Sequence, residues 1–330
     1  MNLYFAPLES ITGFTYRNLH YRYFGGVDKY YAPFISPTHN PEMKGKEIRD
    51  ILPENQAEGL RLIPQILCNK HEFFIKGAKQ LMELGYKDEI NINLGCPSGT
   101  VVSKNKGSGF LRDLEGMDEF FYNIFEWNDG LVDPLYISVK TRIGVKDPEE
   151  FGKIMEVYNK YDFSELIIHP RTRSQMYKDT PNMEAFDYAC KHSRNSLCYN
   201  GDIKSVYDYE QIVEKYDDGV YTGNIMLPSS VSSVMIGRGL IANPNLANEI
   251  KGAAHINLED IKMYHEVLFD EFKKIMKSDK HLLNKMKEFW FYIAEKFEDT
   301  HKVRKLIRKT QNLYKYDLAV NEILENYALK

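Results

Sequence analysis

Short β-type runs alternate with helix-length stretches along the first three quarters of the chain, and this alternation restricts the folds that the chain can adopt. The runs are rich in β-branched and aromatic residues, and in sequence order they span Leu3–Leu8, Lys29–Ile35, Leu62–Leu67, Glu89–Gly95, Leu135–Arg142, Glu165–Arg171, Leu197–Ile203 and Ser233–Gly239. The stretches between them repeat apolar residues at intervals of three and four, as in His71–Leu84, Gly116–Trp127, Pro148–Tyr161 and Ser205–Tyr216. Eight such repeats over about 250 residues are typical of an α/β chain that forms a (β/α)8 TIM barrel.

The segment after the last run has a different character. From Leu258 to Tyr327 the pattern is helical, and the segment is rich in Lys and Glu and poor in Gly and Pro. We therefore expect a barrel domain at residues 1–252 and a small all-helical domain at residues 253–330. A doubly wound sheet is the competing α/β architecture, but it would need a Gly-rich turn after the first strand, where the chain has Ala6-Pro7-Leu8-Glu9-Ser10.

Composition favours a globular protein from a reducing compartment. Hydrophobic residues make up 43% of the 330 residues, which is enough for a sizeable core. The cysteines form no Cys-x-x-Cys pair and no metal-type spacing, so we expect neither a disulfide framework nor a metal site; they are Cys68, Cys96, Cys190 and Cys198. Residues 1–9 include an early carboxylate and no basic leader or long apolar run. We therefore expect a cytoplasmic protein without a membrane span.

The fourth run alternates apolar and polar residues and then breaks into Gly95-Cys96-Pro97. Side chains alternate between the two faces of a strand, so Asn91 and Asn93 share one face. Buried amides cost free energy unless they are hydrogen-bonded, so this face is expected to line a polar ligand pocket rather than a dry core. The run would deliver Cys96 to a loop beside that pocket. The alternative is a core cysteine, because free cysteines are often buried.

Polar and charged side chains stand at the carboxyl ends of most predicted strands. Barrel enzymes carry their chemistry at these ends, and a barrel built only for stability has little need of such groups there. The groups are Gln65, Asn93 with Cys96, Lys140 with Arg142, His169 with Arg171, Asn200 with Asp202, and Gly237-Arg238-Gly239. We therefore expect one functional site at this end of the barrel.

Several of these positions indicate particular ligand chemistry. Asn200-Gly201-Asp202 and Gly237-Arg238-Gly239 follow the last two predicted strands, where barrels often bind phosphate through backbone N–H groups. Lys140 shares a strand face with Arg142, so it must meet an anion there, either a ligand such as reduced flavin or a barrel carboxylate. For His169 the sequence leaves three roles open: a core histidine, a phosphate contact or a flavin-stacking residue.

A series of short motifs extends from about residue 3 to residue 245. The motifs are Ala6-Pro7-Leu8 with Ile11-Thr12-Gly13, Asn93-Leu94-Gly95-Cys96-Pro97, Lys106-Gly107-Ser108-Gly109, Val139-Lys140-Thr141-Arg142-Ile143-Gly144, Ile168-His169-Pro170-Arg171-Thr172, Asn200-Gly201-Asp202-Ile203 and Met235-Ile236-Gly237-Arg238-Gly239. In this order they resemble the motifs of the tRNA-dihydrouridine synthases. That family has a flavin-binding barrel followed by a helical RNA-binding domain, which matches the two domains expected here.

The resemblance implies that the protein reduces uridines in tRNA to 5,6-dihydrouridine, with FMN as cofactor and NADPH or NADH as reductant. It implies that FMN is held by residues from several strand ends, namely Ala6, Pro7, Leu8, Gln65, Lys140, His169, Asn200, Gly201, Asp202, Gly237 and Arg238. It also implies that Asn93 and Arg171 contact the substrate and that Cys96 is the catalytic acid.

The implied reaction requires an acid of the kind that Cys96 offers. Reduction of the uridine 5,6 double bond needs a hydride at C6, which reduced flavin supplies, and a proton at C5 from a positioned acid. A thiol with an ordinary pKa near 8.5 is mostly protonated at neutral pH and able to release its proton. The residues from Asn93 to Ser98 include no charged group that would generate a thiolate, which favours Cys96 as an acid over a nucleophile.

Charge is unevenly distributed along the chain, whose formal net charge is −4. Between Lys273 and Lys315 there are 13 Lys and Arg against five Asp and Glu, which indicates an interaction surface. One helix is expected over His301–Tyr314, with Val303, Leu306, Ile307, Leu313 and Tyr314 packed inward and with Arg304, Lys305, Arg308 and Lys309 on the outer face. Given the resemblance, this outer face is expected to bind the tRNA backbone.

Two other functions are weighed against this one. A flavin-dependent reductase of a free pyrimidine or another small enone-like molecule would use the same barrel but would not need the basic helices. A non-catalytic RNA-binding protein would not need Cys96 and Lys140 together. No obligate protein partner is expected. The segment Tyr221–Val231 is longer and more polar than the link expected from the family, so an extra turn near the phosphate site is expected there.

Overall fold

The structure is a computed structural model that describes residues 1–40, 45–216 and 231–330. The chain divides into two compact units. The first comprises Met1–Pro7, Asp28–Asp202 and Glu210–Ile236, and the second comprises Leu8–Val27, Ile203–Tyr209 and Gly237–Lys330. The domain boundary expected near residue 252 stays a prediction.

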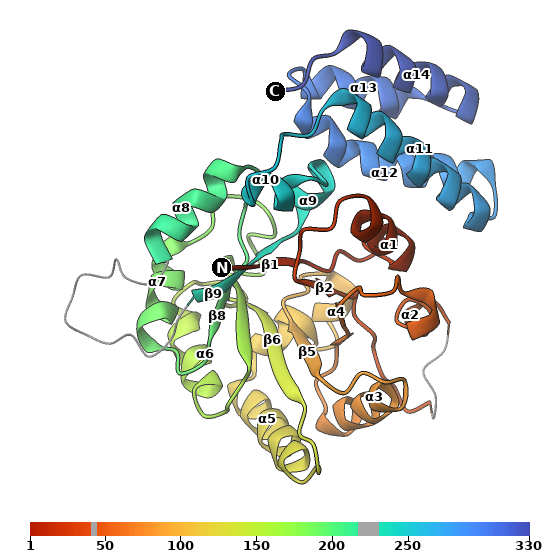
Figure 1. Ribbon diagram of the computed structural model, residues 1–330. Coiled ribbons are helices and arrows are strands. Elements are labelled where there is room, and N and C mark those ends of the chain that lie inside the picture. Colours follow the sequence, from red (N-terminus) through yellow and green to blue (C-terminus); the bar gives the residue numbers. More distant parts are fainter. Residues whose placement is uncertain (41–44, 217–230) are drawn as a thin grey trace. The chain divides into compact units, whose positions relative to one another are not determined.

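The described strands lie in the first unit and form a single parallel sheet that closes into a barrel (Figure 1). They are β1 (Asn2–Phe5), β2 (Lys29–Tyr31), β3 (Leu62–Ile63), β4 (Gln65–Ile66), β5 (Glu89–Leu94), β6 (Tyr136–Arg142), β7 (Glu165–His169), β8 (Leu197–Tyr199) and β9 (Val231–Ile236). Their order across the sheet is β3-β2-β1-β9-β8-β7-β6-β5-β4, so the two edge strands are consecutive in the sequence. The predicted TIM barrel is confirmed.

The third predicted strand is divided at Pro64 into β3 and β4. Strand β3 pairs with β2 and strand β4 pairs with β5, which closes the barrel. Proline has no N–H to donate to a sheet ladder. Its carbonyl oxygen still accepts a hydrogen bond from Asn91 N at 3.0 Å. The eight predicted strands therefore correspond to eight positions around the barrel, one of which is interrupted.

Helices follow most of the strands in the sequence. They are α2 (Lys46–Arg49), α3 (His71–Glu83), α4 (Gly99–Val102), α5 (Leu114–Asp129), α6 (Glu150–Tyr158), α7 (Met183–His192) and α8 (Val206–Tyr216), with the 3-10 helices η1 (Pro53–Asn55) and η2 (Gly107–Arg112). Figure 1 shows α3, α5, α6 and α7 on the outside of the barrel. The outward residues Ile90, Ile92 and Leu94 of β5 are fully buried, as expected for a parallel strand covered on that face.

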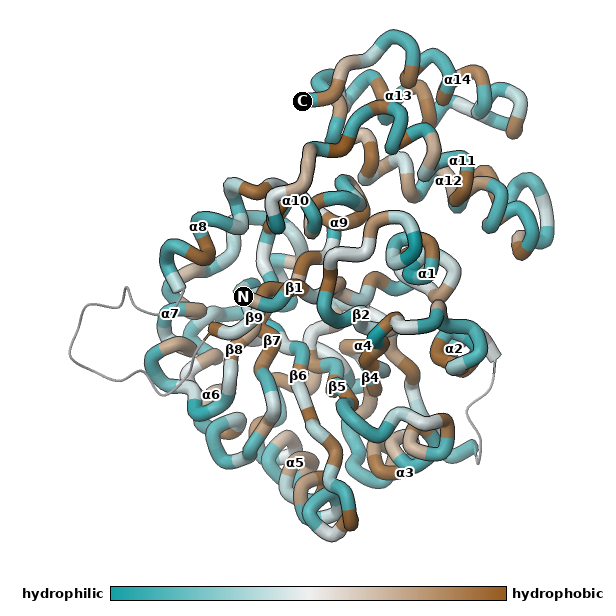
Figure 2. The backbone as a smooth tube through the Cα atoms, in the orientation of Figure 1, coloured by the Kyte–Doolittle hydropathy of each residue, from teal (hydrophilic) through white to brown (hydrophobic). Residues whose placement is uncertain are grey.

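The second unit is helical. Its helices are α1 (Phe14–Tyr23), α9 (Arg238–Ala242), α10 (Leu246–Ile250), α11 (Leu258–Ile275), α12 (Asp279–Ile293), η3 (Ala294–Lys296), α13 (Thr300–Lys309) and α14 (Leu313–Asn326). Hydrophobic and hydrophilic residues alternate along α11 to α14 in Figure 2, as in amphipathic helices. Aromatic side chains join α1 to this bundle, because Tyr16 stacks on Phe289 with ring centroids 5.1 Å apart and Phe24 meets Tyr264 edge to face at 4.9 Å. The predicted helical C-terminal region is confirmed.

The prediction of a single helix over residues 301–314 is wrong, because two helices cover this segment. Helix α13 ends at Lys309, and the Asn312 side chain caps α14 by accepting a hydrogen bond from Lys315 N at 2.9 Å. Val303 and Ile307 are buried as predicted, whereas Tyr314 is 73% exposed. The break changes which side chains point inward.

Two further expectations concern segments of the chain. No helix in the described ranges is long and apolar enough to span a membrane. Residues 221–230, where an extra turn was expected, lie outside the described residues, and Val231 begins β9.

Candidate active site

The barrel interior contains buried polar side chains on β5. Glu89, Asn91 and Asn93 occupy alternate positions of this strand, and all three are buried. Glu89 reaches Lys29 and Tyr31 of β2, a strand that is not its neighbour in the sheet, so this face of β5 points into the barrel. The prediction that the two amides share a polar face is confirmed by this geometry.

Hydrogen bonds connect Glu89, Ser138, Asn91, Gln65 and Asn93 into what we call the interior series. Ser138 Oγ donates to Glu89 Oε1 at 2.7 Å, and Asn91 Nδ2 donates to Ser138 Oγ at 2.8 Å. Gln65 Nε2 donates to Asn91 Oδ1 and Asn93 Nδ2 donates to Gln65 Oε1, both at 2.6 Å. Within the described part of the chain, Gln65 and Asn93 each use one of their two amide N–H groups, so a second N–H is left for a ligand.

The backbone around Cys96 is held from both sides. Asn93 Oδ1 accepts hydrogen bonds from Gly95 N at 3.1 Å and Cys96 N at 2.9 Å. On the other side, Ser108 N and Ser108 Oγ donate to Cys96 O at 3.1 and 2.8 Å. Cys96 itself is half-buried, so it is not the core cysteine that the alternative required.

The other three cysteines provide a contrast with Cys96. All three are buried, and burial raises the pKa of Cys68 and of Cys190 to about 12. Burial also raises the pKa of Cys198 well above its ordinary value. Thiols in such surroundings stay protonated and inert. Cys96 is the cysteine that is not fully buried.

A glycine allows the loop after Cys96 to pack against it. Gly107 has φ of +54°, a conformation that side chains disfavour, and a Cβ there would lie 2.8 Å from Cys96 O and 3.0 Å from Cys96 Cβ. The sequence showed Lys106-Gly107-Ser108-Gly109 as a motif without indicating what it does. In the structure this motif, through Gly107 and Ser108, supports the Cys96 backbone.

Lys140 lies on β6, in register with Asn93 of β5. Among the residues that the structure describes, its ammonium has no hydrogen bond or ion pair. Burial, and secondarily the nearby Arg142 guanidinium, lowers the pKa of Lys140 to about 8. Lys140 is therefore a cation in the barrel without a protein anion beside it.

The barrel carboxylates have other partners, which argues against the alternative that Lys140 pairs with one of them. Glu89 forms an ion pair with Lys29 at 2.6 Å. Glu165 Oε1 accepts hydrogen bonds from Ser233 Oγ at 2.5 Å and Ser232 Oγ at 3.2 Å. Among the described residues, neither barrel carboxylate is therefore paired with Lys140.

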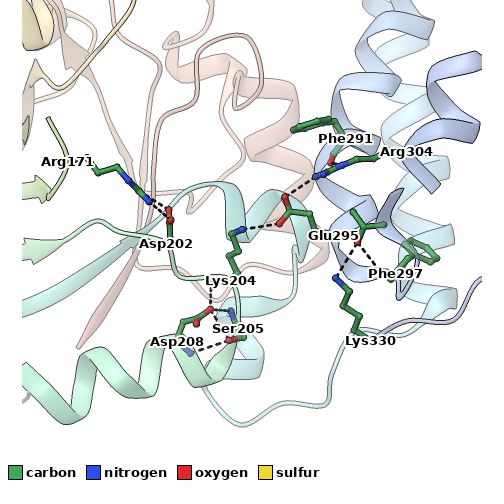
Figure 3. A network of polar contacts seen from close by, with 11 residues as sticks. Arg171, Asp202, Lys204, Ser205, Asp208, Phe291, Glu295, Phe297, Arg304 and Lys330 are labelled. Carbon is green, nitrogen blue, oxygen red and sulfur yellow. Dashed lines mark hydrogen bonds and ion pairs between the residues drawn. The ribbon is translucent and has the colours of Figure 1, made fainter. Parts of the chain in front are cut away.

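Arg171, expected to contact the substrate, is fully buried and directs its guanidinium to protein acceptors. It forms a two-pronged ion pair with Asp202, with N···O distances of 3.0 and 2.5 Å (Figure 3). It also donates to Lys178 O at 3.1 Å and to Asp179 O at 2.5 Å. The sequence pattern could not reveal these acceptors, and the substrate contact expected of Arg171 stays a prediction.

His169 and Asn200 also have protein partners. His169 Nε2 lies 3.2 Å from Arg171 Nη1, and its ring lies 6.0 Å from that of Tyr177. Asn200 Nδ2 donates to Met235 O at 2.7 Å, which joins the ends of β8 and β9. The geometry keeps both residues near the ends of their strands, as predicted, and leaves their cofactor contacts as predictions.

The remaining residues expected to bind the cofactor divide between the two units. Gly201 lies against Tyr199, whose hydroxyl leaves no room for a Cβ there. Ala6 N donates to Ile236 O at 2.8 Å. Pro7 is the last residue of Met1–Pro7, the first stretch of the first unit. Leu8, Gly237 and Arg238 belong to the second unit, where Arg238 begins α9. Their role in binding a cofactor stays a prediction.

The basic face expected on the C-terminal helices is smaller than predicted. Arg304 is half-buried, donates to Phe291 O at 2.8 Å and to Glu295 Oε1 at 2.9 Å, and stacks 4.1 Å from the Phe291 ring centroid (Figure 3). The sequence has no acid between His301 and Tyr316, so the acidic partner from η3 was missed. The three other basic residues of this face, Lys305, Arg308 and Lys309, are exposed on α13.

Sequence reasoning also missed the function of Arg142. It is fully buried, and its Nε donates to Gly95 O at 3.0 Å while its Nη1 donates to Thr172 O at 2.8 Å. Arg142 therefore ties the Cys96 loop to the loop after β7. Its position at a strand end was visible in the sequence, but its backbone acceptors were not.

Comparison with known proteins gives a family and several relatives. The sequence model of the dihydrouridine synthase family (Dus) matches residues 4–328. A probable tRNA-dihydrouridine synthase 2 from Bacillus subtilis (strain 168) is 28% identical over 277 residues, which cover 82% of this chain and 78% of that protein. A probable tRNA-dihydrouridine synthase from Staphylococcus aureus (strain Mu50) is 28% identical over 278 residues, which cover 82% of this chain and 77% of that protein.

Among solved structures, a crystal structure of DHODH in complex with ferulenol from Eimeria tenella matches with a TM-score of 0.49 and 12% identity. The match covers 80% of this chain and 83% of that chain.

Proposed function

The chain belongs to the dihydrouridine synthase family, and from this premise we propose that it reduces uridines in tRNA to 5,6-dihydrouridine. The proposed cofactor is FMN and the proposed reductant is NADPH or NADH. The observation that carries the proposal is that a cation without a partner among the described residues lies close to a half-buried thiol. Lys140 is in register with Asn93, which in turn holds the backbone of Cys96.

The residues of the barrel fit a flavin. Lys140 offers a positive charge that no described protein anion neutralises, and the second amide N–H group of Gln65 can donate to a carbonyl oxygen. A bound flavin would supply the hydride for C6 of the uracil. The other proposed contacts are Ala6, Pro7, Leu8, His169, Asn200, Gly201, Asp202, Gly237 and Arg238.

Cys96 is proposed to deliver the proton to C5 of the uracil. General acid catalysis requires a group that is held in place and still protonated. The hydrogen bonds from Gly95 N, Cys96 N and Ser108 fix the backbone of this loop, and Asn93 keeps an N–H with which it can hold the uracil. Arg171 is proposed to hold Asp202 in place, in addition to the substrate contact that the resemblance implies for it.

The proposed partner is tRNA, bound through the exposed basic residues of α13. Lys305, Arg308 and Lys309 carry the charge for phosphate contacts. No obligate protein partner is proposed, and the cytoplasm is the proposed location because the substrate is tRNA. The alternative is a flavin-dependent reductase of a free pyrimidine or another small enone-like substrate, which would not depend on α13.

The purified protein should contain FMN and should form dihydrouridine when it is given NADPH and unmodified tRNA. Bound flavin is measured by absorbance and by release on denaturation, and dihydrouridine is measured by mass spectrometry of digested tRNA. Free uridine serves as the comparison substrate. A colourless protein that takes up no FMN would contradict the proposal, and reduction of free uridine in preference to tRNA would favour the alternative. Mapping dihydrouridine in tRNA from cells that lack the protein would identify the position.

A further inference from the structure

We propose that Glu89 sets the orientation of the Asn93 amide, and through it the conformation of the Cys96 loop, from the far end of the interior series. Glu89 touches neither Asn93 nor Cys96. It lies at the start of β5, is 4% exposed, and pairs with Lys29. Glu89 would therefore be a positioning residue, and its importance for catalysis rests on the proposed function.

The direction of the hydrogen bonds follows from the chemistry of Glu89. An ion-paired carboxylate can only accept, so Ser138, which has one hydroxyl hydrogen, must donate to Glu89 Oε1. Ser138 Oγ is then an acceptor for Asn91 Nδ2. Because the oxygen and nitrogen of an amide lie on opposite sides, this choice turns Asn91 Oδ1 toward the next member of the series.

The same rule orients the next two amides. Gln65 must present its N–H group to Asn91 Oδ1, which leaves Gln65 Oε1 facing Asn93. Asn93 must then present its N–H group to Gln65, which leaves Asn93 Oδ1 facing the loop. That oxygen accepts the N–H groups of Gly95 and Cys96. A carboxylate at one end of the series thus decides which atom of Asn93 meets the loop.

A reversed series would put the Asn93 amide N–H groups against the N–H groups of Gly95 and Cys96. Two backbone donors would lose their acceptor, and each buried donor without a partner costs about 1–3 kcal/mol. The loop would have to move to recover these bonds. The loop therefore depends on the direction in which the hydrogen bonds of the interior series run, and not only on the existence of these bonds.

Glu165 is a matched control because, among the described strands of the barrel, it is the other buried carboxyl group. It is the first residue of β7, as Glu89 is of β5, and it is 5% exposed. Its hydrogen bonds come from Ser232, Ser233 and Tyr4, and in the described residues none of them joins it to the interior series. Glu165→Gln should disturb packing to a similar degree without changing the polarity of the series.

The variant Glu89→Gln should reverse the series. Lys29 can only donate, so the new amide would place its oxygen toward Lys29 and its N–H group toward Ser138. The Ser138 hydroxyl hydrogen would then have lost its acceptor at position 89, so it would turn to Asn91 and donate to Asn91 Oδ1. Each following amide would have to turn over in response. The measurement is hydrogen exchange of the Gly95 and Cys96 amides by NMR, relative to the other amides of β5. We expect exchange about tenfold faster or more in Glu89→Gln and wild-type exchange in Glu165→Gln.

The double variant Glu89→Gln, Asn91→Asp should restore the original order beyond position 91. An aspartate there accepts from both Ser138 and Gln65, so Gln65 and Asn93 return to their wild-type orientation while the net charge stays unchanged. Wild-type exchange at Gly95 and Cys96 in the double variant supports the proposal, even if Glu89→Gln alone does not fold. Fast exchange in the double variant, or unchanged exchange in a folded Glu89→Gln protein, overturns it.

This exchange measurement uses neither flavin nor tRNA, so it does not depend on the proposed function. Dihydrouridine formation is measured in parallel on the same variants. If the protein proves to have another activity, the exchange result still decides whether Glu89 positions the loop.

Discussion

Cys96 combines a fixed backbone with a half-buried thiol, which is what a proton donor needs. If Cys96 only donates a proton, Cys96→Ala should leave FMN content and NADPH oxidation normal while dihydrouridine formation falls about 10²–10⁴-fold. Stopped-flow measurement of flavin reduction and mass spectrometry of tRNA separate the two half-reactions. Cys190→Ala is the control, because Cys190 is buried and burial raises its pKa to about 12. Wild-type product formation in Cys96→Ala would remove Cys96 from the mechanism.

We expect Lys140 to make binding of the proposed FMN cofactor dependent on pH. Its folded-state pKa of about 8 lies below the ordinary value of 10.5, so the free protein loses this charge as pH rises through 8. Between pH 8 and 10.5 the unfolded chain binds more protons than the folded one, so this group makes the fold more stable, not less, as pH rises.

FMN affinity should fall as pH rises, whereas the stability of the fold rises, because an anionic ligand binds the charged lysine more tightly than the neutral one. We expect the dissociation constant to be constant below pH 7.5 and to rise above pH 8, by up to about tenfold per pH unit. Fluorescence titration from pH 6.5 to 9.5 measures it. Lys140→Met should bind FMN more weakly and with little pH dependence over this range. An equally steep dependence in Lys140→Met would show that another group titrates.

For single residues, the sequence located the polar side chains inside the barrel well. It did not show which of their donor atoms are already bonded to other residues of the protein. Strand alternation was sufficient to place Asn93 and Lys140 inside the barrel, because period two is a local property. The bidentate partner of Arg171 is Asp202, 31 residues away, and the acidic partner of Arg304 is Glu295 of η3, which accepts a single hydrogen bond. Such pairings depend on tertiary structure, which residue type and spacing do not encode.

Helix α13 concentrates exposed positive charge without acidic neighbours on its own surface. The triple variant Lys305→Ala, Arg308→Ala, Lys309→Ala should weaken tRNA binding and make its dependence on log salt less steep by up to about 2–3 units, at 0.7–0.9 per phosphate contact. Arg304 is left unchanged because it holds Phe291 and Glu295. Binding is measured across a salt series, with FMN content and NADPH oxidation as checks on folding.

A control with the same loss of charge uses exposed lysines of the barrel helices, Lys79 of α3, Lys153 of α6 and Lys191 of α7. Its salt dependence should match that of the wild type. If both triple variants bind tRNA alike, α13 is only a solvated face and the RNA binds elsewhere.

At the scale of elements, the sequence predicted types and order well and boundaries less well. Periodicity placed a strand at each barrel position. It did not show that the third predicted strand is divided at Pro64, because the two parts pair with different strands, β3 with β2 and β4 with β5. The break between α13 and α14 has no glycine or proline to mark it. Its one local signal is Asn312, whose side chain caps the second helix, and an asparagine inside a helical pattern is a weak signal by itself.

At the scale of the whole molecule, the compact units do not follow the order of the chain. The sequence indicated a boundary near residue 252 because the strand pattern ends there. Residues Leu8–Val27 nevertheless group with Gly237–Lys330. Composition could not reveal this, because the aromatic partners of α1 are more than 200 residues away in sequence.

This grouping predicts that a chain ending at Gly252 is not an independent folding unit. Tyr16 is 1% exposed and stacks on Phe289, and Phe24 packs on Tyr264, so truncation uncovers aromatic surface on and beside α1. Each fully buried side chain that is uncovered costs about 1.5–3 kcal/mol, which is large against the 5–15 kcal/mol that stabilises a typical domain. We expect the shortened chain to unfold at a lower urea concentration than the full chain and to bind a hydrophobic dye. Phe289→Ala in the full chain should reproduce part of this loss, about 3–5 kcal/mol, and an unchanged urea midpoint in the shortened chain would instead support the boundary at residue 252.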